Sequence, residues 1–350
     1  MKLHNASGKL LAYDDVVILP GYSEIASRMD IDISTSLAGV SLEIPIVGAN
    51  MDSVTGEKMC EVLDQRGGIG ILHRFAPDDV LVSWIDSLTK KGVRFGASVG
   101  VKRDDDHLVK VILGKGVTMI CIDVAHGHHL KVKQRIRYIK SFNSDAIVIA
   151  GNVCTNDGAE FLAEAGADII KVGIGSGSLC TTRLVTGCGS PQLSAVMEAA
   201  KVKKRYPNVS IIADGGIRNP GDVVKALAAG ADAVMIGNLL AGTDESPGDK
   251  IVFGPFTKPK IYKQYRGSAS MSCKADSGSP LDFVEGTSTL IPYRGTVETV
   301  TKPIEHGLRS GMSYVGAADI KSLKAKAVMA EITQNGIYEG TPHGASELDS

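Results

Sequence analysis

The 350-residue sequence lacks three features that would each indicate a particular class of protein. None of its six cysteines forms a C-x-x-C pair, which argues against a zinc cluster and for reduced thiols in a cytoplasmic setting. No apolar run approaches the roughly 18 residues that span a bilayer, and no charged-then-apolar leader opens the chain. The formal net charge of −1 gives no electrostatic case for nucleic acid or a membrane surface as partner. With 43% hydrophobic and 22% charged residues, the composition is that of an ordinary globular protein.

Short apolar runs recur along the chain after residue 44. Polar or glycine-containing loops follow them, and then helix-like patterns such as 104–113 and 156–164. This alternation predicts parallel strands covered by helices, and eight such units predict a (β/α)₈ barrel, a TIM barrel of the α/β class. A doubly wound open sheet is the alternative, weakened because no G-x-G-x-x-G motif follows the first run. The eight runs are 45–49, 70–72, 95–99, 119–122, 147–150, 169–172, 211–213 and 233–236.

The remaining segments are interpreted as additions to one catalytic domain that occupies residues 1–350. Residues 1–44 are irregular and are expected to form an N-terminal arm with short strands. Residues 242–312 are rich in Gly, Ser, Pro and charge, which predicts a long, mobile, flap-like insertion at the active site, after the eighth strand. The polar residues 341–350 are expected to be a disordered tail.

Polar residues follow most of the predicted strands directly. In a barrel these positions meet at one face, where active sites lie. The sequence therefore predicts a pocket there, built from residues that would be scattered in the chain. They are Asn50, Met51, Asp52, Ser53, His73, Arg74, Asp123, His126, Asn152, Asp214, Gly215, Gly216, Gly237 and Asn238.

The most informative stretch is the glycine-rich loop after the sixth strand, in residues 171–192. It reads K-V-G-I-G-S-G-S-L-C-T-T-R-L-V-T-G-C-G-S-P-Q. Glycines let such a backbone approach a phosphate or an ion closely. Cys180 lies among backbone amides that can stabilise a thiolate, the nucleophilic form of cysteine. A tight turn with an incidental buried cysteine is the alternative interpretation.

Several motifs in this order resemble one family. They are A-N-M-D at 49–52, G-S-G-S-L-C-T-T-R at 175–183, A-D-G-G-I-R at 213–218, A-L-A-A-G-A-D-A-V-M-I-G at 226–237, Y-R-G-S-A-S at 265–270 and Y-V-G-A at 314–317. On these motifs the sequence resembles the IMP dehydrogenase and GMP reductase family over residues 10 to 325.

Within that family, three features favour GMP reductase. Residues 72–75 run directly into a predicted helix from Pro77, without the regulatory CBS modules that IMP dehydrogenases usually insert there. The short segment 265–285 contains no Arg-Tyr dipeptide, the pair with which the dehydrogenases hydrolyse their intermediate. Segments 98–102, 122–128, 150–153 and the glycine-rich loop resemble bacterial GMP reductases, although R-G-S-A-S and P-Y-R-G also resemble dehydrogenases. Asn238 replaces a phosphate-binding serine of dehydrogenases, and Ser176 is often proline in reductases.

The resemblance implies NADPH-dependent reductive deamination of GMP to IMP and ammonia, in a cytoplasmic homotetramer. Cys180 would form a thioimidate, and Thr182 and Glu285 would move the protons. Carbonyls of Gly175, Gly177 and Cys180 would coordinate a monovalent cation, expected to be K⁺. Asp123, Ala125 and Asn152 would contact the cofactor. The purine nucleotide monophosphate would contact Ser178, Asp214, Gly216, Gly237, Tyr265, Gly267, Ser268 and Gly286. Among these, Asp214 would bind the ribose hydroxyls, and Ser178 with the amides of Gly216 and Gly237 would hold the phosphate.

Three alternatives to this assignment stay open. One is an IMP dehydrogenase that lacks its regulatory modules and converts IMP and NAD to XMP. Another is a purine-nucleotide-binding protein that has lost turnover, against which the intact set of Cys180, Thr182 and Glu285 argues. The third is a reductase for a modified purine nucleotide.

Overall fold

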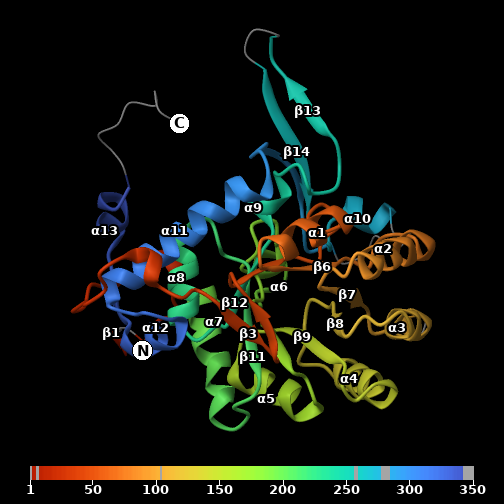
Figure 1. The fold of residues 1–350 in the computed structure, drawn as a ribbon, viewed down its shortest axis with the longest axis horizontal. Coiled ribbons are helices and arrows are strands. Elements are labelled where there is room, and N and C mark those ends of the chain that lie inside the picture. Colours follow the sequence, from red (N-terminus) through yellow and green to blue (C-terminus); the bar gives the residue numbers. More distant parts are fainter. Residues whose placement is uncertain (1, 5–7, 103–104, 256–258, 277–283, 342–350) are drawn as a thin grey trace.

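A computed structural model of the chain describes residues 2–4, 8–102, 105–255, 259–276 and 284–341. Its centre is a closed barrel of eight parallel strands in which β12 pairs with β5, so the (β/α)₈ prediction is confirmed (Figure 1). Seven of the eight strands are buried along nearly their whole length because side chains fill the inside and helices cover the outside. The barrel strands are β5 (Ile46–Gly48), β6 (Ile69–Leu72), β7 (Phe95–Val99), β8 (Met119–Ile122), β9 (Ile147–Val153), β10 (Ile169–Val172), β11 (Ser210–Asp214) and β12 (Ala233–Ile236).

Helices alternate with these strands and form the outer layer. Helix α5 illustrates why each begins and ends where it does: the Thr155 side chain accepts the Gly158 amide at 3.1 Å, and Gly166 ends the helix at φ 105°. The inward-facing residues of α5 include Leu162, which is buried against the barrel. The outer helices are α1 (Glu57–Gln65), α2 (Asp78–Lys90), α3 (Asp105–Gly114), α4 (Leu130–Phe142), α5 (Asn156–Ala165), α7 (Gln192–Ala199), α8 (Pro220–Ala228) and α11 (Val297–Val315).

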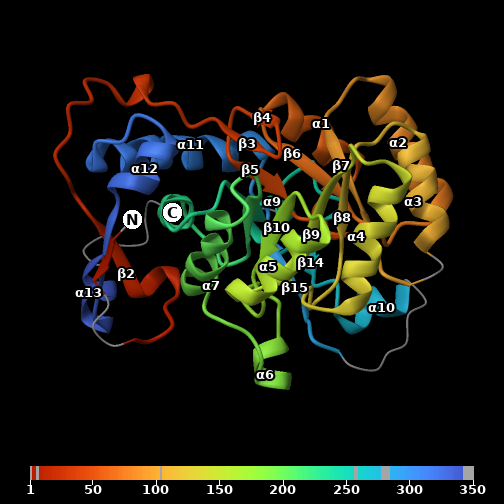
Figure 2. The ribbon, with the colours of Figure 1, turned by 90° about the horizontal axis from the view of Figure 1, so that it is seen from below.

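The short strands of the N-terminal arm take part in two small sheets. Strand β2 (Val16–Leu19) pairs with β16 (Val328–Glu331), which also pairs with β1 (Lys2–His4), at the end of the molecule far from α2 and α3 (Figure 2). The hairpin of β3 (Thr35–Leu37) and β4 (Val40–Leu42) contacts the amino ends of the barrel strands. There, the Ala38 amide donates to the Ser210 hydroxyl at 3.0 Å. The arm therefore closes the barrel opposite the predicted site.

Short 3₁₀ and α-helices complete the outer parts of the chain. The 3₁₀ helices are Tyr13–Asp15, Arg28–Asp30 and Ala200–Lys204. The remaining α-helices are α6 (Thr182–Thr186), α9 (Asn238–Ala241), α10 (Met271–Asp276), α12 (Ile320–Lys326) and α13 (Gln334–Glu339). Of the expected tail 341–350, only Thr341 lies among the described residues.

The insertion after β12 forms an antiparallel sheet that projects from the barrel (Figure 1). Its strands are β13 (Lys250–Phe253), β14 (Lys260–Arg266) and β15 (Ser288–Pro292), and α10 follows β14. The expected range 242–312 is wrong at its end, because 297–312 belong to helix α11, whose Ile304 and Leu308 are buried. Pro303, Gly307 and Gly311 make this helix resemble a loop in sequence, while its apolar residues at 297, 300, 304, 308 and 312 keep a helical period.

We expect Gly70→Ala to lower the free energy of unfolding by about 1–3 kcal/mol through overpacking. A Cβ atom on Gly70 would lie 2.6 Å from Cys60 Sγ and 2.7 Å from Cys60 Cα, so α1 would have to move away from β6. Urea unfolding followed by circular dichroism measures the effect. Gly114→Ala at the end of α3, where a Cβ would meet nothing within 4 Å, is the matched control. An equal loss in both variants would contradict the packing argument.

Candidate functional site

A pocket of about 430 Å³ lies at the carboxyl ends of the barrel strands, between the strand-end loops and the projecting insertion. This volume falls in the range of sites that bind small ligands. The loops after β5, β6, β8, β10 and β11 contribute to its lining, and Asn152 contributes from the end of β9. Thirteen residues to which the resemblance gave a role line it: Asp123, Ala125, Asn152, Gly175, Gly177, Cys180, Thr182, Asp214, Tyr265, Gly267, Ser268, Glu285 and Gly286. Asn50, Met51, Arg74 and Gly215, which were expected from their places after strands, also line it.

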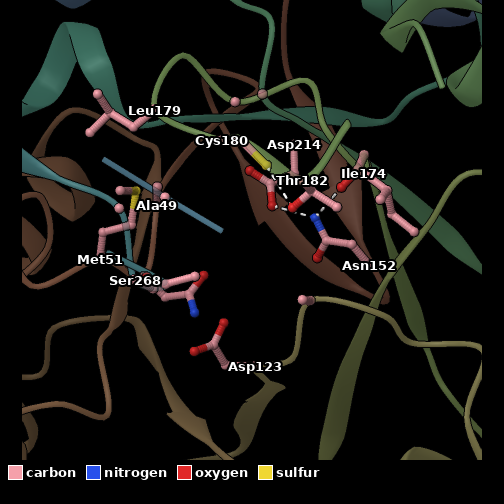
Figure 3. Close-up of a pocket in the computed structure, with 18 of the residues that line it drawn as sticks. Ala49, Met51, Asp123, Asn152, Ile174, Leu179, Cys180, Thr182, Asp214 and Ser268 are labelled. Carbon is pink, nitrogen blue, oxygen red and sulfur yellow. Dashed lines mark hydrogen bonds between the residues drawn. The ribbon is translucent and has the colours of Figure 1, made fainter. Parts of the chain in front are cut away.

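Cys180, Thr182 and Glu285 form a continuous chain of hydrogen bonds. The Cys180 thiol lies 3.1 Å from Thr182 Oγ1, and the Thr182 hydroxyl donates to Glu285 Oε2 at 2.8 Å (Figure 3). All three side chains are half-buried. A hydroxyl between a thiol and a carboxylate can pass a proton from one to the other, so this arrangement suits acid–base chemistry next to a nucleophile.

Backbone pairing brings Glu285 to the cysteine loop from 103 residues away in the chain. The Thr181 amide donates to the Glu285 carbonyl at 3.0 Å, and the Thr287 amide donates to the Leu179 carbonyl at 3.0 Å. Cys180 and Gly286 form an antiparallel bridge between these bonds. The main chain thus positions Glu285 independently of its side chain.

The cysteine loop turns sharply because glycine occupies its tightest points. Gly173 has φ 145°, and a Cβ there would lie 2.1 Å from the Asp214 carbonyl oxygen. The Gln192 side-chain amide then donates to the carbonyls of Val172 and Asp214, at 2.8 and 3.0 Å. These bonds join the start of α7 to the ends of β10 and β11 and hold both ends of the loop.

Asp214 is held on one side of the pocket by two donors. Lys171 Nζ and Asn152 Nδ2 donate to Asp214 Oδ2 at 2.7 and 2.9 Å. Burial is the largest single influence on the pKa of Lys171 and lowers it, but Asp214, Cys121 and Asp123 together outweigh burial, so the pKa is raised and the lysine stays charged. The side chains of Cys180, Thr182, Asp214 and Asn152 gather at this side (Figure 3).

Asp123 lies apart from that group, where the cofactor was expected (Figure 3). Arg74 Nε donates to Asp123 Oδ2 at 3.1 Å, and the Arg74 guanidinium lies 4.7 Å from the centre of the Phe75 ring. Cation and ring therefore pack together along the pocket wall. This half of the pocket offers a carboxylate, a guanidinium and an aromatic face.

Three residues that were expected to hold the phosphate do not line this pocket: Ser178, Gly216 and Gly237. Ser178 instead lies near the buried Tyr265 hydroxyl, which donates to Met51 Sδ at 3.9 Å, and a Cβ on Gly237 would lie 2.9 Å from the same oxygen. Burial raises the pKa of Tyr265, so this hydroxyl stays protonated. Gly216 lies against Tyr13 and Gln192. Their expected phosphate contacts stay a prediction.

Lys171 lines the pocket but was not assigned a role from the sequence. The run 169–172 was interpreted as an apolar strand, and Lys171 was passed over in it. Its charge inside a predicted buried strand could have indicated a role, because a buried charge needs a partner. Its 5% exposed fraction shows how completely it is buried.

The thiols of Cys121 and Cys273 differ from Cys180 in their surroundings. Burial raises the pKa of each to about 12, so they stay protonated at neutral pH.

Within the described residues, no three His, Cys, Asp or Glu side chains are grouped in a way that could hold a metal ion. Among these same residues, no helix is both long and apolar enough to cross a bilayer.

Comparison with known proteins identifies the family. Residues 10–343 match the family model described as the IMP dehydrogenase / GMP reductase domain. The chain belongs to this family. It is thereby an oxidoreductase of purine metabolism, in a family that uses a nicotinamide cofactor.

Relatives in this IMP dehydrogenase/GMP reductase family carry both names. The IMP dehydrogenase of Cryptosporidium parvum is 37% identical over 391 residues, covering 96% of this chain and 95% of the relative. The GMP reductase of Lactobacillus delbrueckii subsp. bulgaricus is 38% identical over 332 residues, covering 94% and 96%. That of Clostridium acetobutylicum is 37% identical over 332 residues, covering 94% and 97%. The family is established by these similarities, while the names of the relatives divide between two reactions.

Beside the pocket, His73 should make stability depend on pH. Burial, opposed in part by Asp52 and Asp123, lowers its pKa from 6.5 to about 4, and its Nδ1 accepts the Phe75 amide at 3.1 Å. Between pH 6.5 and 4 the unfolded chain binds more protons at this residue, so the free energy of unfolding falls as pH falls. We expect His73→Asn to reduce that slope by up to about 1.4 kcal/mol per pH unit. Urea titrations at several pH values measure it, and identical slopes in both proteins would refute the assignment.

Proposed function

We propose that this protein catalyses NADPH-dependent reductive deamination of GMP to IMP and ammonia. The observation that carries the proposal is the hydrogen-bonded series Cys180–Thr182–Glu285 in the pocket. It offers a nucleophile together with a proton path to a carboxylate, which is what displacement of an amine requires.

In the proposed reaction, the Cys180 thiolate adds to C2 of the purine. The C2–N bond then breaks, and the amine leaves as ammonia after taking a proton that passes from Glu285 through the Thr182 hydroxyl. The product of these steps is a thioimidate between Sγ and C2. A reduced nicotinamide, when bound, would supply the hydride for this carbon, and Sγ would depart as a thiolate to leave IMP.

The residues proposed to hold the cofactor are Asp123, Ala125 and Asn152. The half of the pocket around Asp123 fits a nicotinamide ribose, because a carboxylate that Arg74 already holds can accept hydroxyl groups. Asn152 lies on the other side, where it donates to Asp214. The proposal also includes NADPH as the cofactor and a homotetramer as the assembly. Both are inferred from the resemblance to GMP reductases.

A monovalent cation, K⁺ in the proposal, would bind carbonyls of Gly175, Gly177 and Cys180. The loop fits such an ion because Gly175 has φ 79°, a conformation that turns its carbonyl differently from those of its neighbours. The Gly177 carbonyl also accepts the Cys180 amide at 3.1 Å, which leaves its second lone pair for a cation.

IMP dehydrogenase without regulatory modules is the second candidate, since relatives at similar identity carry that name. Two observations favour the reductase. The alignment with the Cryptosporidium parvum enzyme extends over 391 residues, more than the 350 of this chain, so that dehydrogenase has residues with no counterpart here. The two GMP reductases align over 332 residues. In addition, Arg266 and Arg294 flank the segment where the dehydrogenases carry their Arg-Tyr pair, and neither is followed by tyrosine.

The purified protein should form IMP from GMP and NADPH, with little or no XMP from IMP and NAD⁺. Without an arginine and tyrosine to activate water, hydrolysis of a thioimidate should be slow. Loss of ammonia can still use Thr182 and Glu285. Chromatography of the products, with absorbance at the nicotinamide band, measures both reactions. Robust XMP formation without GMP deamination would reverse the assignment, and turnover of neither pair would favour an inactive nucleotide-binding protein or a modified substrate.

Substitutions in the Cys180–Thr182–Glu285 series should separate the catalytic steps from nucleotide binding. We expect Cys180→Ala to abolish turnover while nucleotide binding, measured by calorimetry, persists, because the loop backbone would hold the phosphate. Glu285→Gln should lower kcat by about 10²–10⁴-fold, since the amide cannot supply a proton. Thr186→Val, which removes a nearby exposed hydroxyl that donates to the Thr182 carbonyl and accepts the Cys188 amide, is the control for loop disturbance. Full activity in Cys180→Ala would exclude the thiol as nucleophile.

A further inference from the structure

Lys171 is a buried cation of the pocket that the proposed reaction does not use, and no other lysine among the described residues lines that pocket. It lies inside strand β10 with 5% of its surface exposed, and its side chain lines the pocket. Burying a charge is costly unless a partner compensates for it, so a lysine here needs a specific contact. That contact is the carboxylate of Asp214, 2.7 Å away.

Both donors to this carboxylate reach the same oxygen. Lys171 Nζ and Asn152 Nδ2 converge on Oδ2, and the described residues make no hydrogen bond to Oδ1. Asp214 keeps 21% of its side chain exposed, so Oδ1 is available on the pocket side. A carboxylate fixed at one oxygen presents the other in a defined direction, which is what recognition of two adjacent hydroxyls requires.

The backbone of Asp214 is fixed without the lysine. Its carbonyl oxygen accepts the Ser176 hydroxyl at 3.0 Å and the Gln192 side-chain amide at 3.0 Å. Removing the lysine charge should therefore leave the carboxylate held at Oδ2 by Asn152 alone, and less firmly oriented, while the main chain of the pocket stays in place. We therefore expect loss of the lysine to change which ligands bind, while the backbone of the site keeps its shape.

We propose that Lys171 is a positioning residue that makes the site select nucleotides with an intact ribose cis-diol. The inference rests on the proposed function and on the expectation that Asp214 receives the ribose hydroxyls of the nucleotide. Lys171 holds Oδ2 and neutralises the carboxylate, so that Oδ1 is aimed at the 2′- and 3′-hydroxyls. Arg74 holds Asp123 Oδ2 in the same way on the cofactor side of the pocket.

The test compares the binding of IMP and 2′,3′-dideoxy-IMP by calorimetry, without nicotinamide, so that no turnover occurs. IMP takes part in both candidate reactions, which keeps the result independent of the choice between them. We expect the wild type to prefer IMP by at least about tenfold, since hydrogen bonds to a charged acceptor are lost in the dideoxy ligand. In Lys171→Met, which keeps most of the side-chain volume, this preference should fall to near unity while affinity for the dideoxy ligand changes little.

Two further variants make the result specific. Asp214→Asn should reduce the preference similarly, and the double variant with Lys171→Met should reduce it no further, because both changes act through one carboxylate. Lys263→Met is the matched control. Lys263 is also a buried lysine, with 2% exposed, but it donates to the carbonyls of Thr243 and Ser246. It should leave the preference of the wild type unchanged.

The outcomes separate this inference from the proposed function. Equal weakening of both ligands in Lys171→Met would assign the lysine a structural role only and overturn the inference. Equal binding of both ligands by the wild type would overturn it as well. If the wild type binds neither ligand, the proposed function itself fails.

Discussion

The pairing between the cysteine loop and the end of the insertion is the interaction on which the site depends. Backbone bonds at Leu179 and Thr181 hold Thr287 and Glu285 in place, and the Gly267 amide also donates to the Thr287 carbonyl at 3.0 Å. The loop belongs to the barrel, whereas Glu285 belongs to the projecting insertion. Because main-chain bonds join them, the proton path to Cys180 exists only when the insertion lies against the barrel mouth.

The barrel supports this arrangement by limiting how the loop can move. Both ends of the loop are tied by Gln192 to the strands beneath, while the middle pairs with the insertion. Two carboxylates, Asp214 and Asp123, lie at different strand ends, and each is held by a cation from another strand or strand end. Charges in the pocket are therefore oriented before a ligand arrives, which lowers the cost of organising them during a reaction.

The strands and the location of the pocket could be predicted from the sequence because they depend on local patterns. Runs such as 119–122 are apolar and short, and polar residues follow them directly. The end of the insertion was misjudged because Pro303 and two glycines in α11 resemble loop residues, although tertiary packing on α8 keeps the helix intact. The distances within the Cys180–Thr182–Glu285 series, and the contact between Lys171 and Asp214, depend on segments far apart in the chain. Sequence periodicity carries no information about such contacts.

The small sheet of β1, β16 and β2 has a consequence for how the chain reaches its folded state. Residues 16–19 pair with residues 328–331, so more than three hundred residues separate the two partners. Loop-closure entropy must be overcome before such a contact stabilises the fold, and contacts of this span slow folding. During synthesis, strand β2 stays without its partner until nearly the whole barrel has left the ribosome. Assembly of this sheet is therefore a late event, which follows closure of the barrel.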